Sequence, residues 1–279
     1  MRNAILLLSI TILLFACDKD DDNPSNSSTP AENNLPERYK SLKGIFNGNG
    51  IGAAATLGEG VILFFNQDGD QYAWYENQEI KVVRNVDDSE SIFRNGPFTS
   101  IGAAARTSQG RLALVNSTGN LFYSVNFTPS SIEGGWSNPD LITSSDPQRS
   151  ITFWGESGGN TISFNTVSVL WNLTRVGDEC LEAEVEFERV YMANGVRNEM
   201  QPYFTPGDFY SDGPFNINLW RATNRCGGND GTIPFTSISA AARNIRSNSV
   251  EEILFNADGT QFCFYTVGEG VVSEIYDLY

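Results

Sequence analysis

The chain has 279 residues, 40% of them hydrophobic, so it is long enough to bury a substantial core as one large domain or two ordinary ones. Its formal net charge of −16 disfavours contact with nucleic-acid phosphates and suits a secreted or surface-exposed protein. It contains no histidine, which excludes Ser-His-Asp and Cys-His catalysis, histidine zinc sites and axial histidine ligation of haem.

Residues 1–16 are typical of a signal peptide. Arg2 supplies a short positive region, and residues 4–15 form an apolar run that is too short to span a bilayer comfortably. The run ends in Ala16-Cys17, and a small residue followed directly by cysteine resembles a bacterial lipobox. This resemblance implies that Cys17 is diacylated and anchors the protein in a membrane. The alternative is an ordinary cleaved signal peptide with an incidental cysteine.

Residues 17–36 are predicted to be a flexible tether. Residues 18–22 read Asp-Lys-Asp-Asp-Asp, and residues 23–36 are rich in Asn, Ser, Pro and Glu and cannot bury apolar area. An acidic stretch directly after a lipidated cysteine resembles the surface-export signal of Bacteroidota lipoproteins. This resemblance implies an outer-membrane lipoprotein whose folded part, residues 37–279, is exposed at the cell surface.

A segment of small residues recurs in the folded part. Residues 97–106 read Pro-Phe-Thr-Ser-Ile-Gly-Ala-Ala-Ala-Arg, residues 234–243 differ only in a serine at position 239, and residues 51–55 are a shorter copy. Ile101 lies 50 residues after Ile51. A repeat of this length indicates an array of like units.

A second element of the repeat follows each copy and reads Asn-x-Asp-Gly or Asn-x-Thr-Gly. These tetrads end at Gly69, Gly119 and Gly259. Asn, Asp and Gly tolerate the positive φ that a tight hairpin demands, so each tetrad predicts a turn between two strands. In the first unit the turn joins the apolar residues 61–65 to the aromatic residues 71–75, and residues 79–83 form a more polar outer strand.

Four short antiparallel strands per unit is the plan of a β-propeller blade. Small residues in the first strand suit a position near the central axis, and the second strand is apolar on both faces because blades would stack on both sides of it. Residues 181–188 alternate apolar residues with glutamate, which predicts a solvated outer strand. We therefore predict an all-β protein, a β-propeller of about five blades, or alternatively four with a long insertion in the third.

Two families share these patterns. The Ile-x-Ala-Ala opening, together with Asp-Gly-Asp-Gln-Tyr-Ala-Trp-Tyr at residues 68–75, resembles hemopexin repeats, whereas residues 110–137 look closer to sugar-binding lectins of the tachylectin kind. The aspartate that precedes Ala-Ala in hemopexin repeats is replaced by Gly52, Gly102 or Ser239. We therefore expect no metal site and no other cofactor.

Two arginines and two tryptophans are candidate ligand contacts. Arg106 and Arg243 follow the alanines in two units, where they would lie near one rim of the channel and could bind an acidic or sugar ligand. The alternative is that they are surface charges inherited with the repeat. Trp74 and Trp136 could stack on sugar rings, or they could pack between blades.

The favoured function is non-enzymatic binding of a glycan or protein, without contact to nucleic acid. The main alternative is a glycan-cleaving enzyme that uses paired carboxylates. The candidate carboxylates are Asp68, Asp70, Glu156, Asp212 and Asp258. Most of them lie in hairpin turns, and turn geometry explains them without catalysis, so we expect no catalytic residue. A structural component of an envelope complex is a third possibility.

Three cysteines remain once Cys17 is lipidated. Cys180 and Cys226 are the candidate disulfide, since an oxidising exterior permits the bond. Cys263 lies in an alternating strand and is expected to be buried as a small apolar residue. With five blades, Cys180 and Cys226 would occupy similar places in neighbouring blades, a separation that disfavours the bond, and the four-blade alternative relaxes this problem.

Overall fold

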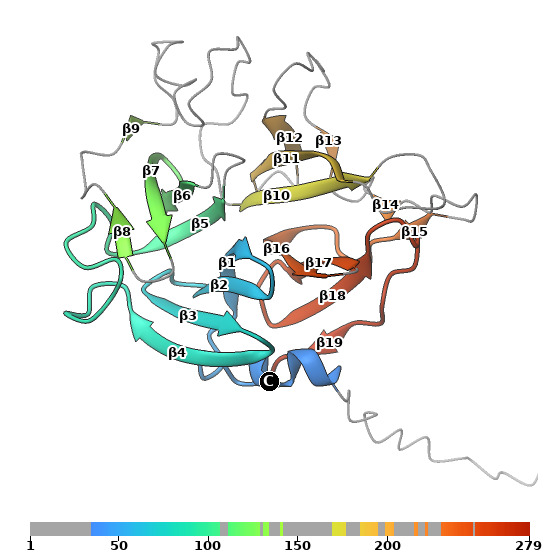
Figure 1. The fold of residues 1–279 in the computed structure, drawn as a ribbon, viewed down its shortest axis with the longest axis horizontal. Coiled ribbons are helices and arrows are strands. Elements are labelled where there is room, and N and C mark those ends of the chain that lie inside the picture. Colours follow the sequence, from blue (N-terminus) through green and yellow to red (C-terminus); the bar gives the residue numbers. More distant parts are fainter. Residues whose placement is uncertain are drawn as a thin grey trace, which may run out of the picture. The chain divides into compact units, whose positions relative to one another are not determined.

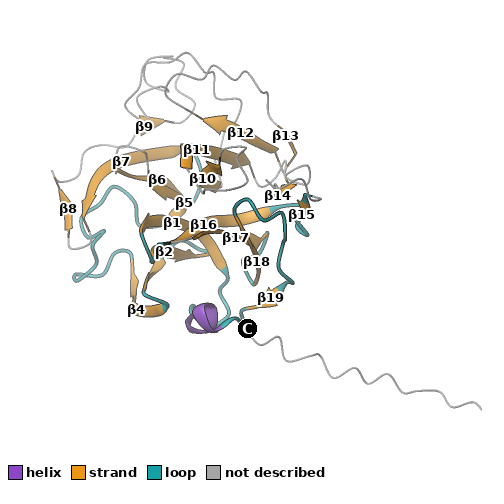
Figure 2. Ribbon diagram, turned by 45° about the vertical axis from the view of Figure 1, so that its right-hand side comes forward, coloured by secondary structure: helices purple, strands orange, loops and turns teal. Residues whose placement is uncertain are grey.

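A computed structural model describes most of the predicted folded part. The described residues are 35–106, 111–128, 131–133, 140–141, 169–176, 185–194, 199–203, 215–216, 221–222, 230–247 and 249–279. Asn34–Tyr279 form one compact unit. The described part is all-β apart from one short 3-10 helix, η1 (Glu37–Leu42), so the prediction of an all-β protein is confirmed (Figures 1 and 2).

The strands form four antiparallel sheets of four or five strands and one small two-stranded sheet. The first sheet contains β1 (Ile51–Gly58), β2 (Val61–Asn66), β3 (Gln71–Glu76) and β4 (Glu79–Asn85). The second contains β5 (Ile101–Arg106), β6 (Arg111–Asn116), β7 (Leu121–Thr128), β8 (Ser131–Glu133) and β9 (Asp140–Leu141). The third contains β10 (Val169–Val176), β11 (Val185–Asn194), β12 (Glu199–Tyr203) and β13 (Phe215–Asn216). The fourth contains β16 (Ile238–Arg246), β17 (Ser249–Asn256), β18 (Gln261–Thr266) and β19 (Tyr276–Asp277). The small sheet pairs β14 (Arg221–Ala222) with β15 (Gly231–Thr232).

The first strands of the four sheets lie against one another. β1 contacts both β5 and β16, and β10 also contacts both β5 and β16 (Figure 1). A parallel bridge joins Glu59, directly after β1, to Ile245 of β16, so these two strands run in the same direction. The sequence predicted that the alanine-rich segments open the first, second and fourth sheets, and β1, β5 and β16 confirm this. These opening strands are also where the sheets contact one another.

Apolar side chains fill the spaces between neighbouring sheets. In β2, Ile62 and Phe64 pack in the cluster shared with the fourth sheet, whereas Leu63 and Phe65 pack in the cluster shared with the second. All four are completely buried. This confirms the expectation that the second strand is apolar on both faces, because each face meets another sheet.

The turn tetrads and the alanine strands are physically linked, which explains why they recur together. Gly69 and Gly259 have positive φ, and their carbonyl groups accept hydrogen bonds from Ile101 N and Ile51 N, both at 2.9 Å. These two turns therefore bond to the first strand of the next sheet. Within the turn, the side chain of Asn66 accepts a hydrogen bond from Gln71 N at 3.0 Å.

The third sheet differs from the prediction. Residues 185–188 belong to β11, where the described pairings join them to β10, whereas residues 190–194 of this strand pair with β12 as well. β11 is therefore the second strand in the order of its sheet and not the last one, and the predicted exposure of residues 181–188 stays a prediction. Residues 181–184 lie outside the described part. Alternation identifies a strand with two unlike faces, but it carries no information on the place of that strand in the sheet.

Candidate functional site

Arg106 and Arg243, the two arginines selected from the sequence, lie toward the same end of the first strands. Thr56, Arg106 and Arg243 each follow the third alanine of their strand; we call them the rim residues. Arg243 N donates to Thr56 Oγ1 at 2.6 Å, and Thr56 Oγ1 donates back to the Arg243 carbonyl oxygen at 2.8 Å. Arg106 Nη1 donates to the carbonyl oxygen of Leu57. All three therefore join neighbouring first strands.

The two arginines differ in accessibility. Arg243 is only 3% exposed, and its cross-strand partner Glu252 is fully buried, so both charges lie inside the protein on one face of the fourth sheet. Arg106 is half-buried. Of these two arginines, only Arg106 therefore has a solvent-accessible surface that a ligand could contact, whereas Arg243 is a buried residue of the fold.

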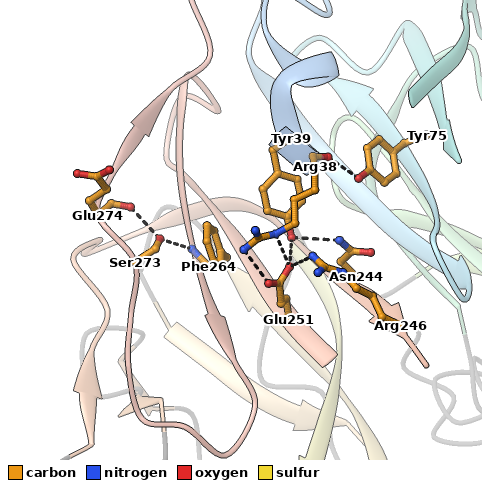
Figure 3. A network of polar contacts seen from close by, with 9 residues as sticks. All are labelled: Arg38, Tyr39, Tyr75, Asn244, Arg246, Glu251, Phe264, Ser273 and Glu274. Atoms are coloured by element: carbon orange, nitrogen blue, oxygen red, sulfur yellow. Dashed lines mark hydrogen bonds and ion pairs between the residues drawn. The ribbon is translucent and has the colours of Figure 1, made fainter. Parts of the chain in front are cut away.

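A second polar cluster centres on Glu251, which the sequence analysis did not select (Figure 3). Its carboxylate accepts hydrogen bonds from Arg38 Nε at 3.0 Å, Tyr39 OH at 2.5 Å and Arg246 Nη2 at 2.6 Å. Asn244 Nδ2 donates to the same tyrosine oxygen at 3.2 Å. The sequence does contain a sign of this cluster, which is the pair of consecutive glutamates in the otherwise apolar strand β17. When a strand is buried on both faces, both carboxylates need hydrogen-bond or ionic partners inside the protein.

Burial sets the titration of the tyrosines in this cluster. The pKa of Tyr39 is raised above its usual range, first by burial and then by the neighbouring Glu251 carboxylate. Burial also raises the pKa of Tyr75, to about 12. Tyr75 OH donates to the carbonyl oxygen of Arg38 at 2.6 Å. Both phenols are therefore neutral donors at neutral pH.

Trp74 packs between sheets. It is 8% exposed, and its ring stacks on Phe127 of the second sheet with 6.0 Å between centroids and 30° between planes. This arrangement matches the packing alternative, and it leaves little ring surface for a sugar. Trp136 lies outside the described residues.

The described turn carboxylates have structural partners, within the turn for Asp70 and Asp258 and in the segment before β1 for Asp68. Asp70 Oδ1 accepts from Asn66 Nδ2 at 2.7 Å, and Asp258 Oδ1 accepts from Thr260 N and Oγ1 at 3.1 and 2.6 Å. Asp68 Oδ2 accepts from Asn49 Nδ2 at 2.6 Å. The other two candidates, Glu156 and Asp212, lie outside the described part of the chain.

Cys263 is a buried free thiol, as expected, and burial raises its pKa to about 12. Cys17, Cys180 and Cys226 lie outside the described residues, so the lipid anchor and the disulfide stay predictions. Among the residues that the structure describes, no group of three or more Cys, Asp or Glu side chains could hold a metal ion. The same part of the chain has no helix that is long and apolar enough to cross a membrane.

Comparisons with known proteins found no matching protein family and no matching curated protein. Similar solved structures include virginiamycin B lyase from Staphylococcus aureus, at 12% identity and a TM-score of 0.29, covering 82% of this chain and 54% of that one. Another is the gluconolactonase XC5397 from Xanthomonas campestris, at 8% identity and a TM-score of 0.32, covering 82% of this chain and 86% of that one.

A third is BBS1N in complex with ARL6DN, at 7% identity and a TM-score of 0.28, covering 78% of this chain and 49% of that one. The chain thus spans about half the length of two of these three proteins. All three are β-propeller proteins. Their likeness to this chain is too remote to carry an argument about its function.

Proposed function

We propose that the chain is a lipid-anchored surface protein that presents a four-bladed β-propeller for non-enzymatic binding of a glycan or protein. One observation carries the proposal: the four first strands contact one another in a closed cycle, β1 to β5 to β10 to β16 and back to β1. Radial sheets arranged in this way place corresponding loops on common faces, where they can form one recognition surface. Blade count, anchor and ligand are all parts of this proposal.

The rim end of the first strands is the proposed ligand face. Arg106 stands there half-buried on β5, and a guanidinium group suits an acidic group or the hydroxyls of a sugar. The turn face at the other end of these strands uses its amide and carboxylate side chains within its own turns, as Asn66, Asp70 and Asp258 do. The partly accessible charge described at the rim is thus a cation, whereas the charges described at the turns are carboxylates, so an acidic group is expected to bind at the rim.

A glycan array probed with soluble residues 18–279 tests the binding role. We expect selective glycan binding without release of sugar, and weaker binding by an Arg106→Ala variant that keeps the wild-type circular dichroism spectrum. Arg84→Ala is the matched control, because Arg84 is also a partly exposed arginine but lies on the outer strand β4. Released sugar would contradict the proposal in favour of a carboxylate enzyme, and silence on both assays would favour a structural component of an envelope complex.

The anchor has its own test. Because Cys17 is the proposed acylation site, Cys17→Ala should abolish labelling by a radioactive fatty acid and release the protein from the outer-membrane fraction. Cys263→Ala is the control, since it removes a buried thiol and leaves the anchor intact. A Cys17→Ala protein that still fractionates with the outer membrane would contradict the lipid anchor.

A further inference from the structure

Residues 35–46, here called the latch, lie between the first and fourth sheets. Four of their side chains pack into the apolar cluster shared by β2 and β17. They are Leu35, Tyr39, Leu42 and Phe46. The latch is hydrogen-bonded to segments of both sheets. Its Gly44 N donates to the carbonyl oxygen of Leu278, just after β19, at 2.8 Å, and the side-chain hydroxyl of Ser41 donates to the carbonyl oxygen of Gln78, between β3 and β4, at 2.9 Å. Figure 2 shows η1, which belongs to the latch, beside the C-terminus.

The latch presents one guanidinium group to the fourth sheet. Arg38 Nε donates to Glu251 Oε2 at 3.0 Å, and Arg38 Nη2 lies 2.8 Å from Glu251 Oε1 (Figure 3). Two parallel contacts between a planar fork and a carboxylate form the bidentate arrangement that arginine makes and lysine cannot.

Aromatic rings enclose the same guanidinium group. Its central carbon lies 4.6 Å from the centroid of the Phe264 ring and 5.1 Å from that of Tyr39. The Tyr276 ring stacks on Phe264, with 5.9 Å between centroids and 9° between planes, which holds the Phe264 ring in place. Stacking on aromatic faces adds a second preference for a delocalised planar cation.

The carboxylate that receives Arg38 is built into the sheet. The side chain of Glu251 is 6% exposed, and Tyr39 and Arg246 also donate hydrogen bonds to it. Arg246 lies on the neighbouring strand β16 and orients the carboxylate independently of the latch, whereas Tyr39 belongs to the latch itself. The Arg38 side chain is 26% exposed, so the position of its guanidinium group is reachable from solvent.

We propose that Glu251 and Phe264 of the fourth sheet form a guanidinium-recognition site, that its ligand is Arg38 of the chain's own latch, and that the neighbouring latch residue Tyr39 completes the aromatic enclosure. Occupation of this site fastens the latch across the junction between the first and fourth sheets. The site recognises the fork and the plane of the cation as well as its charge. This proposal does not depend on the proposed glycan or protein ligand, because it concerns a contact within the chain itself, between Arg38 and Glu251.

Chemical rescue tests the proposal with residues 18–279. Arg38→Ala leaves an uncompensated part of a buried charge cluster and should lower Tm by about 5 °C or more. Millimolar methylguanidinium should enter the vacated position and restore about half of that loss or more, whereas methylammonium, which lacks the planar fork, should restore little of it. Arg38→Lys should stay closer in Tm to Arg38→Ala than to the wild type.

Arg84→Ala is the matched control, because the Arg84–Glu90 pair, at 2.9 Å, has a glutamate side chain that is 73% exposed. Its Tm should change little, and methylguanidinium should not raise it. A wild-type Tm for Arg38→Ala, or equal rescue by methylguanidinium and methylammonium, would overturn the proposal. An equal methylguanidinium effect on Arg38→Ala and Arg84→Ala would overturn it as well.

Discussion

At the scale of single residues, glycine recurs in the repeated motifs because the backbone there lies too close to other backbone atoms to leave room for a side chain. A Cβ atom at Gly259 would lie 2.1 Å from the carbonyl oxygen of Ile51, and one at Gly69 would lie 2.4 Å from that of Ile101. Gly52 and Gly102 sit at bulges in β1 and β5. The turn glycines therefore permit the close approach of neighbouring sheets, whereas Gly52 and Gly102 permit the close approach of a first strand to the turn of its own sheet.

The pair Gly259→Ala and Gly44→Ala tests this explanation. Both glycines have similar positive φ, 68° and 71°, but nothing lies within 4 Å of a Cβ placed at Gly44. Gly44→Ala should lower the free energy of unfolding by about 1 kcal/mol through backbone strain alone. Gly259→Ala should cost at least about 2 kcal/mol more, because it also displaces the Ile51 backbone. Equal losses in urea unfolding would show that the inter-sheet contact does not matter.

Two buried weakly acidic groups, the Cys263 thiol and the Tyr75 phenol, make the stability of the fold decrease at alkaline pH. The Cys263 thiol has an ordinary pKa of 9.0 and a folded pKa of about 12, and burial raises the pKa of Tyr75 from 10.0 to about 12. Between these values the unfolded chain has released protons that the folded chain retains, so stability is fully present below about pH 9 and falls as the pH rises toward 12.

Urea unfolding midpoints measured from about pH 8 to about pH 11 should therefore decrease. The part of the decrease that starts near pH 9 should be smaller in Cys263→Ala, since that variant lacks the thiol. The quantity to compare is the slope of the urea midpoint against pH, because the loss of packing in Cys263→Ala lowers its midpoint already at neutral pH. A midpoint that stays constant over this range would contradict the assignment.

Some features of single residues could be predicted from the sequence and others could not. The turn tetrads were predictable because Asn-x-Asp-Gly acts within four residues. The contact between Arg38 and Glu251 was not, because the two residues are 213 positions apart and neither stands in a motif. The packing role of Trp74 was one of two open alternatives, since a tryptophan in an aromatic strand suits both a core and a binding surface.

At the scale of elements, the first strands are held together by polar contacts as well as by alanine packing. Thr56 is 4% exposed, and its side chain bonds both to the backbone N–H and to the backbone carbonyl of Arg243. Three first strands were predictable because each contains three consecutive alanines. The third sheet was not, since β10 opens with Val-Leu-Trp-Asn-Leu and shares no small-residue pattern with the others.

Thr56→Val keeps the shape of the side chain but removes the two hydrogen bonds that Thr56 Oγ1 makes to the Arg243 backbone of β16. The Arg243 N–H would lose this partner inside the protein, so the variant should lose about 1–3 kcal/mol of unfolding free energy. Thr260→Val is the control, because Thr260 Oγ1 bonds to Asp258 at an exposed turn, and it should change stability by no more than about 0.5 kcal/mol. Comparable losses in the two variants would refute a special role for Thr56.

At the scale of the whole molecule, closure of the fold joins the two ends of the described chain. The latch packs against the fourth sheet, the C-terminal Leu278 accepts a hydrogen bond from Gly44, and Ile51 bonds to Gly259. The sequence predicted that the folded part begins near residue 37, but it gave no indication that the first residues close the junction between the first and fourth sheets. Such closure depends on contacts between distant segments, which a single sequence does not encode locally.

A crystal structure of residues 18–279 is the most direct test of the central claim, which is the radial arrangement of like sheets. The account predicts four sheets around one axis, with β10 between β5 and β16 and with β14 and β15 outside the set of first strands. A sandwich of sheets packed face to face would contradict the account, and so would a fifth blade built on β14 and β15.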